Sequence, residues 1–266
     1  MAGFPFDSLN PGHSPVNALA LARAAALAYS DKEAIEKTIR DAWGFSGFLS
    51  LDDPGTDTQA FLAVNDDMVL ILFRGTQATH VKDLATNVHI KLVSGPAGKV
   101  HEGFLGALGA VWDDLIKFIR NERGSRALWV TGHSLGAALA TLAVARLRLE
   151  SVELNGLYTF GSPRVGDEDF TRAFDADIKD QTFRYVNNND VVPRVPPRLS
   201  KYDHVGTIKY FDTDGDLHGE LPWLEKLKDR LEGRWEDFLK PGTDGIKDHD
   251  MKNYITNLEK AKAASA

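Results

Sequence analysis

The clearest apolar run in the chain is MVLILF, residues 68–73, where six consecutive side chains are hydrophobic. A second apolar run, residues 61–64, precedes it and is separated from it by the turn-forming residues NDD. A short continuous apolar run of this kind predicts a strand that is buried on both faces, as in the centre of a parallel sheet. These two runs are therefore expected to form sheet core.

Helical and strand patterns alternate through the middle of the chain. Apolar residues at spacings of three and four predict helices over 18–43 (with an interruption near 29–32), 103–122, 135–150 and about 168–177. Short strands are predicted between or after them, at 126–132, 156–163, 183–190 and 207–211. Such alternation favours parallel strands joined by crossover helices. The predicted fold class is α/β, with a mostly parallel central sheet flanked by helices.

The last third differs in character, because residues 221–239 form a strongly charged amphipathic pattern and residues 248–263 predict a final helix. The joining stretch KPGTDGIK has the composition of a loop. No repeat or linker divides the 266 residues, so one domain spanning 1–266 is expected.

Composition narrows the classes of function. The chain has 31 Lys and Arg against 38 Asp and Glu, a net charge of −7, which makes nucleic acid a poor candidate partner. It has no cysteine, which excludes disulfides and a thiol nucleophile. No apolar stretch reaches the length of a membrane span, and no basic residue precedes Arg23, so a secretory signal is not expected. The compartment stays open between the cytoplasm and a mature secreted form whose signal has been removed.

The segment TGHSLGAAL, residues 131–139, places Ser134 between Gly132 and Gly136, after a predicted strand and before a predicted helix. The pentapeptide fits the G-x-S-x-G elbow, in which the serine occupies a strained turn and the glycines let neighbouring backbone pass. An ordinary strand-to-helix turn is the alternative. The strand and helix context favours a nucleophile, which requires a base and an acid elsewhere in the chain.

The acid and the base are sought downstream, because the order after such an elbow is serine, acid, histidine. Asp190 lies at the carboxyl end of the segment 183–190, where sites in such sheets gather, and Asn187–Asn189 are expected to hold its hydrogen bonds. Three histidines follow it: His218 in a glycine-rich turn expected to be solvated, His204 leading into a strand, and His249 at the start of the last helix. Spacing alone does not separate His204 from His249.

An oxyanion hole needs two donors. The backbone N–H of Leu135, which follows the serine, would supply one donor. Thr76, which follows Gly75 at the end of the most apolar strand, would supply the other through its N–H and its hydroxyl. A plain strand-terminal turn at Gly75–Thr76 is the alternative.

Seven ordered motifs carry a resemblance to the class 3 lipases, a family that includes filamentous-fungal triacylglycerol lipases and related plant and bacterial acylhydrolases. They are FRGT at 73–76, VHEGF at 100–104, VTGHSLGAALATLA at 130–143, YTFGSPRVGDEDF at 158–170, NNNDVVPRVPP at 187–197, YDHVG at 202–206 and DHDMKNYI at 248–255. Together they span roughly residues 60–255. The resemblance implies an α/β-hydrolase fold.

Carried over position by position, the resemblance implies Ser134 as nucleophile, Asp190 as acid and His249 as base. It implies oxyanion roles for Thr76 and Leu135. The segment containing His204 is a structural motif in that family, and Pro163–Arg164 match a segment that looks architectural.

Two segments depart from the family pattern. The lid-like segment at about 76–92 reads TQATHVKDLATNV after the glycine and has no aromatic residue, whereas fungal lids carry a tryptophan. The helical insertion at about 217–242 carries Trp223, Trp235 and Phe238. Two interpretations stay open for it: an amphipathic helix packed on the domain, or a second lid that touches the acyl pocket or an interface.

The resulting hypothesis is a carboxylic ester hydrolase that acts through an acyl-enzyme and needs no cofactor. Its expected partner is a small-molecule or lipid ester, with transient contact at a lipid–water interface left open. A phospholipase, a feruloyl-type esterase or an acyltransferase on the same scaffold is the alternative, and a noncatalytic lipid-binding protein is favoured less. The segment DTDGD, 212–216, resembles the start of a calcium loop, but its glycine is at position four instead of six, which indicates a turn. No metal site is expected.

Overall fold

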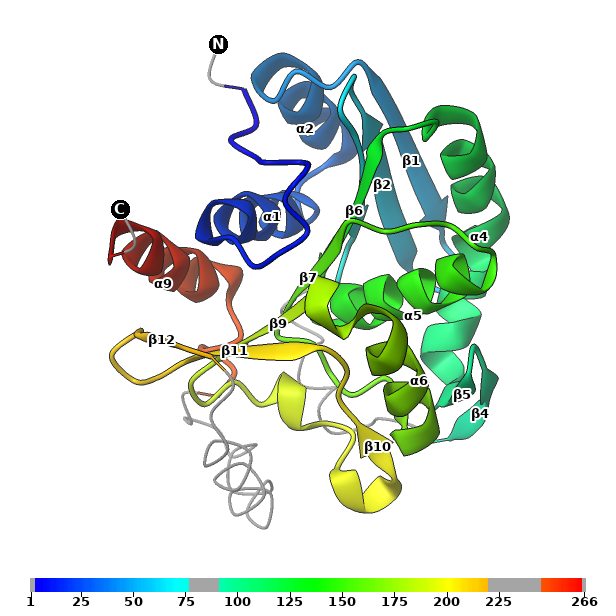
Figure 1. Cartoon of the computed structure of the whole chain (residues 1–266), viewed down its shortest axis with the longest axis vertical. Helices are drawn as coiled ribbons and strands as arrows, with labels where there is room; N and C mark the ends of the chain where they lie inside the picture. Colours follow the sequence, from blue (N-terminus) through cyan, green and yellow to red (C-terminus); the bar gives the residue numbers. More distant parts are fainter. Residues whose placement is uncertain (1–2, 77–90, 220–244, 265–266) are drawn as a thin grey trace.

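The computed structural model describes residues 3–76, 91–219 and 245–264, apart from the side chain of Leu199. The lid-like segment expected at about 76–92 and the helical insertion expected at about 217–242 therefore lie mostly outside the described residues, as does the helix expected over 221–239. The fold built by the remaining residues is shown in Figure 1.

A central sheet runs through the molecule and holds eight strands among the described residues, in the order β1-β2-β3-β6-β7-β9-β11-β12. The strands are β1 (Gly47–Asp53), β2 (Thr58–Val64), β3 (Met68–Phe73), β6 (Ala127–His133), β7 (Gly156–Phe160), β9 (Thr182–Asn187), β11 (Thr207–Phe211) and β12 (Leu217–His218). The strands from β3 to β11 pair in parallel, and β1, β2 and β12 pair antiparallel at the edges. The predicted mostly parallel sheet is confirmed.

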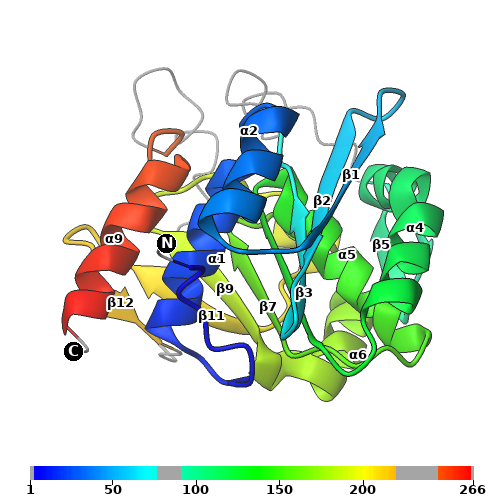
Figure 2. The same ribbon diagram turned by 90° about the horizontal axis from the view of Figure 1, so that it is seen from above.

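Helices cover both faces of this sheet (Figure 2). One face carries α4 (Glu102–Glu122), α5 (Leu135–Leu149) and α6 (Glu168–Ile178), and the other carries α1 (Pro15–Leu27) and α9 (Met251–Ala264), with α2 (Lys32–Lys37) nearby. A π-helical turn, Thr38–Ala42, continues α2, and 3-10 turns occupy Lys179–Gln181, Val192–Arg194 and Arg198–Ser200. None of the described helices combines the length and apolar character that a bilayer crossing requires.

Strand β3 shows why its whole length is apolar. Val69, Ile71 and Phe73 belong to the core cluster under α4 and α5, whereas Met68, Leu70 and Leu72 belong to the cluster under α1 and α9. Successive side chains of a strand point to opposite faces. Because both faces of this strand are covered, no position is left for a polar side chain, as the sequence pattern predicted.

The helices begin where a side chain accepts a hydrogen bond from the first turn. Ser14 accepts from the N–H of Asn17 and is followed by Pro15, so α1 begins three residues before the predicted start at 18. Asp31 caps α2 in the same way, which explains the predicted interruption near 29–32. Asp167 caps α6 through the N–H of Phe170.

Two parts of the sheet structure were missed by the sequence patterns. The sequence analysis predicted no strand at 47–53, but β1 occupies Gly47–Asp53 and pairs with β2 along its full length. A second sheet was not predicted at all: β4 (Leu92–Gly95), β5 (Gly98–His101), β8 (Gly166–Asp167) and β10 (Tyr202–Asp203) pair in the order β10-β8-β5-β4. Its strands have two to four residues, too few to show an alternating pattern.

Candidate functional site

Ser134 lies at the sharp turn between β6 and α5, with backbone angles φ 58° and ψ −128°. A positive φ is uncommon for a residue with a side chain and marks stored backbone strain. The turn is held by a 3.0 Å hydrogen bond from the N–H of Ser134 to the carbonyl of Phe160 on the neighbouring strand β7. Ser134 itself is buried.

The two glycines beside Ser134 allow three backbone segments to pack against one another. A Cβ on Gly132 would lie 2.3 Å from the carbonyl oxygen of Gly136, and a Cβ on Gly136 would lie 2.3 Å from the carbonyl oxygen of Phe73. Both distances are far inside van der Waals contact. The reason predicted for these glycines, room for neighbouring backbone, is confirmed.

Asp190 and His249 form a buried pair. Asp190 follows β9, and His249 occupies the turn that leads into α9. The Nδ1 atom of His249 lies 2.8 Å and 3.0 Å from the two carboxylate oxygens of Asp190. Because a carboxylate only accepts, Nδ1 carries the proton and donates it to Asp190. In the neutral imidazole, Nε2 is then left with its lone pair, as a general base requires.

Two further donors hold the carboxylate of Asp190. The N–H of Val192 donates to Oδ1 at 2.9 Å, and the hydroxyl of Tyr254 donates to Oδ2 at 2.6 Å. Burial, together with the adjacent charge of Asp190, raises the pKa of Tyr254 well above its usual value, so this hydroxyl keeps its proton. The same hydroxyl accepts from the N–H of Asn187 at 3.1 Å.

The asparagines before Asp190 bind a different carboxylate from the one expected. Asn187–Asn189 were expected to hold Asp190, but Asn188 Nδ2 and the N–H of Asn189 donate to Asp248 Oδ2 at 3.3 Å and 3.1 Å. Asn187 Nδ2 donates to the carbonyl of Asp248 at 2.8 Å. Asn188 has φ 34°, a backbone angle that asparagine adopts more readily than most residues. The asparagine turn therefore ties the acid segment to the base segment.

Gly161 lies between the serine elbow and the Asp190–His249 pair. It has φ 57°, and a Cβ there would lie 2.7 Å from His249 Cε1 and 2.9 Å from Asp190 Oδ2. Its neighbour Phe160 accepts the hydrogen bond of the elbow. Among the described residues, the buried atoms Ser134 Oγ and His249 Nε2 have no hydrogen-bond partner. No hydrogen bond therefore joins Ser134 Oγ to His249 Nε2 in the structure.

The residues expected to bind an oxyanion lie next to the elbow. A Cβ on Gly75 would lie 3.2 Å from the Cβ of Ser134, which brings the end of β3, and Thr76 after it, against the serine. Leu135 is the first residue of α5, where backbone N–H groups have no partner within the helix. The oxyanion roles of Thr76 and Leu135 stay predictions.

The other two candidate histidines bond elsewhere. His204 Nε2 lies 2.7 Å from the carbonyl oxygen of Pro193, and His218 Nε2 lies 2.7 Å from Asp212 Oδ2. His218 was expected to be solvated; its side chain is about one-third exposed and is ion-paired when protonated. Of the three histidines that follow Asp190 in the chain, His249 is the one that contacts it.

The segment 212–216 forms a turn in which Asp212 Oδ1 accepts from the N–H groups of Asp214 and Asp216. Within the part of the chain that the structure describes, no group of three or more His, Asp or Glu side chains could hold a metal ion. Arg164 is buried and donates to the carbonyls of Arg194 and Pro196, an architectural contact.

A cavity of about 450 Å³ opens beside His249. It is mainly apolar, with polar groups near the site, and its lining comes from the end of α1, the end of β3 and β6, and the segment leading into α9. The lining residues are Ala26, Tyr29, Thr76, His133, Ile246, Lys247, His249, Asp250, Met251, Lys252 and Ile255. A lining of this kind suits an apolar ligand held by a few polar groups.

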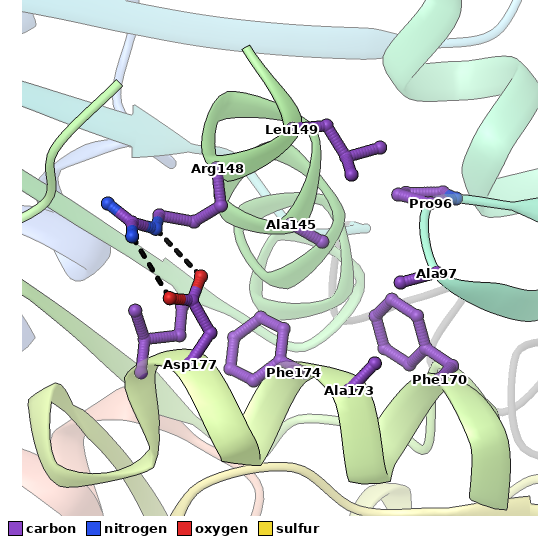
Figure 3. Close-up of a pocket in the computed structure, with 10 residues that line it drawn as sticks. Pro96, Ala97, Ala145, Arg148, Leu149, Phe170, Ala173, Phe174 and Asp177 are labelled. Carbon is purple, nitrogen blue, oxygen red and sulfur yellow. Dashed lines mark hydrogen bonds and ion pairs between the residues drawn. The ribbon is translucent and has the colours of Figure 1, made fainter. Parts of the chain in front are cut away.

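A smaller hollow of about 140 Å³ lies at the opposite end of α5, between α6 and the β4–β5 turn. Figure 3 shows Phe170 and Phe174 along one side of it and the Arg148–Asp177 ion pair at one edge. Both polar groups are already paired, with Arg148 Nε 2.8 Å from Asp177 Oδ2. It lacks a free reactive group and is not the candidate site.

Three residues of the site were not found from the sequence. Tyr254 donates to Asp190, and Tyr29 and His133 form a hydrogen-bonded chain to the backbone of His249. His133 stands inside the serine motif, and Tyr254 lies five residues after His249, but neither spacing has a general chemical meaning. Tyr29 follows α1, more than 100 residues from the elbow, and no local pattern marks it.

Comparison with known proteins gives one family. Residues 70–200 match the family described as Lipase (class 3). The chain is 36% identical over 163 residues to a secreted mono- and diacylglycerol lipase of Penicillium cyclopium, covering 58% of this chain and 52% of the relative. It is 34% identical over 169 residues to a lipase of Rhizomucor miehei, covering 59% and 46%. The chain thus matches about half the length of these curated relatives.

Solved structures give the same result for the fold. The triacylglyceride lipase of Rhizomucor miehei superposes with a TM-score of 0.68 at 25% identity, covering 88% of this chain and 92% of that one. A fungal lipase in complex with an inhibitor gives a TM-score of 0.64 at 26% identity, covering 75% and 80%. The expected α/β-hydrolase fold is confirmed.

Proposed function

Because the chain belongs to the class 3 lipase family, we propose that it is a carboxylic ester hydrolase of the lipase type, acting on acylglycerols or similar acyl esters. The observation that carries this proposal is the buried Asp190–His249 pair beside a serine on a strained elbow. Relatives named as mono-, di- and triacylglycerol lipases support the substrate class. The apolar cavity beside His249 is suited to an acyl chain.

In the proposed mechanism, Ser134 Oγ attacks the ester carbonyl while His249 Nε2 takes its proton. Asp190 orients the imidazole and stabilises the imidazolium that forms. The N–H groups of Thr76 and Leu135, with the Thr76 hydroxyl, bind the oxyanion. His249 then protonates the leaving alcohol and activates the water that releases the acid. The mechanism uses no cofactor.

The domain arrangement belongs to the same proposal: one α/β-hydrolase domain with a lid-like segment at about 76–92 and a helical insertion at about 217–242. Without an aromatic residue in the first segment, lipid contact would depend on Trp223, Trp235 and Phe238 of the second. Whether an apolar lid operates is tested by measuring activity against esters of graded acyl length, below and above their solubility limit. A rate increase above the limit is expected if an apolar lid operates; a smooth curve contradicts it.

Replacing Ser134 by Ala is expected to lower kcat on the order of 10⁵-fold with an unchanged melting temperature, because members of a triad act as a unit. The measurement is hydrolysis of a soluble p-nitrophenyl ester. A fluorophosphonate probe located by peptide mass spectrometry gives an independent readout, since it should label Ser134 in the parent protein. Near-full activity of the variant would refute the nucleophile.

The different contacts of His249 and His204 predict different effects when each is replaced. His249→Ala is expected to abolish fluorophosphonate labelling, because it removes the base that activates Ser134. His204→Ala is expected to lower the melting temperature through the lost bond to Pro193 while Ser134 still becomes labelled. The reverse result would exchange their roles.

A phospholipase, a feruloyl-type esterase or an acyltransferase is the second candidate, since fold alone does not set the acceptor or the ester. A panel of triglyceride emulsion, phospholipid vesicles, feruloyl ester and an alcohol acceptor separates them by product. A noncatalytic lipid-binding protein would show no turnover in any assay and no probe labelling.

A further inference from the structure

His133 is a buried titratable residue that the mechanism above leaves without a role. It is the last residue of β6, directly before Ser134, and is 5% exposed. Its Nε2 atom lies 2.8 Å from the backbone carbonyl oxygen of His249, and its Nδ1 atom lies 2.7 Å from the hydroxyl of Tyr29. Both ring nitrogens are therefore engaged.

These partners assign the proton on the ring. A carbonyl only accepts, so Nε2 of His133 donates to His249 and carries the hydrogen. In the neutral ring Nδ1 is then an acceptor, and the hydroxyl of Tyr29 donates to it. Burial holds the pKa of His133 well below its usual value, and the neighbouring His249 lowers it further. Burial likewise raises the pKa of Tyr29, which keeps its proton.

In the described part of the chain, three groups face His133, and they come from the segments at α1 and α9. Tyr29 follows α1, His249 precedes α9, and the ring of Tyr254 on α9 lies edge-on at 6.1 Å. The His133 and His249 rings are in close contact and tilted, with centroids 4.3 Å apart and planes at 32°. A charge on His133 would therefore stand beside the imidazolium that His249 becomes during ester cleavage.

We propose that His133 is a positioning residue for the base: its Nε2–H holds the backbone of His249, and its neutral ring leaves room for the positive charge that His249 acquires. The hydroxyl of Tyr29 donates to Nδ1 of His133, and this hydrogen bond keeps the ring proton on Nε2. The inference rests on the proposed function, since it concerns the same base. It assigns a role to the second residue of the G-H-S-L-G elbow and to a tyrosine more than 100 residues away from it.

The test compares His133→Leu, which removes the donor, with His133→Gln, which keeps an N–H. In His133→Leu, kcat for a soluble p-nitrophenyl ester and the rate of fluorophosphonate labelling are expected to fall on the order of 10- to 100-fold, because a misplaced base slows the chemical step. In His133→Gln, kcat is expected to recover to within about fivefold of the parent, since the hydrogen bond is restored.

Thr131→Val is the matched control. Thr131 lies two residues earlier on β6, is equally buried, and donates through Oγ1 to the carbonyl of Tyr158 at 2.9 Å. Loss of this hydrogen bond in Thr131→Val is expected to lower the melting temperature without changing kcat or the far-downfield NMR signal of the His249–Asp190 proton. In His133→Leu this signal is expected to shift or broaden.

The outcomes separate the inference from the function it rests on. If the parent protein is neither active nor labelled, the proposed function fails. If it is active and His133→Leu has the parent's kcat, or if Gln and Leu lose activity equally, the inference is overturned and the triad stands. Should His133→Leu not fold, Tyr29→Phe decides: a kcat lowered by roughly three- to tenfold supports the inference, and an unchanged kcat overturns it.

Discussion

At the scale of single residues, the candidate site depends on two backbone positions with positive φ, Ser134 and Gly161. Ser134 carries strained angles, which typically cost about 1–3 kcal/mol, and the bonds and packing around the elbow must offset that cost. Gly161 is the other such position, since its φ is positive and the space beyond its Cα is filled by His249 and Asp190. The geometry of the pair thus depends on an absent methyl group.

Gly161→Ala is therefore expected to lower kcat by about 100-fold, because displacement of the imidazole by even an ångström disrupts proton transfer. Ester hydrolysis by the folded variant measures this. Gly206→Ala is the control: Gly206 also has a positive φ, 72°, but a Cβ there would meet Thr182 and not the site. Both variants should lose stability, and only the first should lose turnover. Equal turnover in the two would contradict the role of Gly161.

Residue patterns allowed Ser134 and Asp190 to be identified as candidates because each directly follows a strand that the sequence marks clearly. They did not separate His249 from His204, since the base lies on a loop whose position depends on tertiary packing. The hydrogen-bond partners predicted for Asp190 were wrong for the same reason, since Tyr254, which donates to it, lies on a helix 64 residues later. Long-range hydrogen bonds leave no local trace in a sequence.

At the scale of elements, α9 carries both the support for Asp190 and the segment with the base. Its apolar residues Met251, Tyr254 and Leu258 pack in the cluster with α1. The alanines of α1 allow the two helices to lie side by side, as Figures 1 and 2 show. Docking of α9 therefore determines whether His249 is in place.

Leu258→Ala is expected to cost about 2–5 kcal/mol in the free energy of unfolding and to raise amide hydrogen exchange locally in residues 246–258. Because the base segment then opens more often, fluorophosphonate labelling should slow as well. Leu147→Ala, equally buried in the cluster on the other face, is the control. It should lose similar stability while the folded protein is labelled at the parent rate; uniform exchange in both variants would contradict this.

Helices of ten or more residues were predicted well because their apolar repeat extends over several turns. Central strands were predicted well because both of their faces are buried and their sequences are continuously apolar. Strand β1 was missed because it is an edge strand whose residues are mostly half-buried, which leaves no clear apolar pattern. The β10-β8-β5-β4 sheet was missed because its strands have only two to four residues. That the whole chain forms one domain stays a prediction.

At the scale of the whole molecule, stability should depend on pH through histidines that folding keeps neutral. His13 lies 2.7 Å from the hydroxyl of Tyr185, and burial, with the charge of Lys209, lowers its pKa to about 4. Below about pH 6.5, His13 becomes protonated in the unfolded chain but stays neutral in the folded protein. Stability should therefore fall as pH drops from about 6.5 to 4.

His13→Gln is expected to flatten this part of the stability profile, since the titrating group is gone while a hydrogen bond to Tyr185 remains feasible. Chemical denaturation midpoints at pH 7, 5.5 and 4 measure it. Lys209→Gln removes the neighbouring charge, so the pKa of His13 should rise and the loss of stability should be smaller. Parallel profiles for all three proteins would show that His13 does not set the acid limit.

The pairing of α1 with α9 has a consequence for biosynthesis. More than 220 residues separate the end of the first helix from the start of its partner, so during translation the part of α1 that α9 covers stays exposed until α9 has been synthesised. Contacts of such long sequence separation form late. The nascent chain would thus carry its serine long before the segment bearing the histidine leaves the ribosome, and catalytic competence would arise only after α9 has docked on α1.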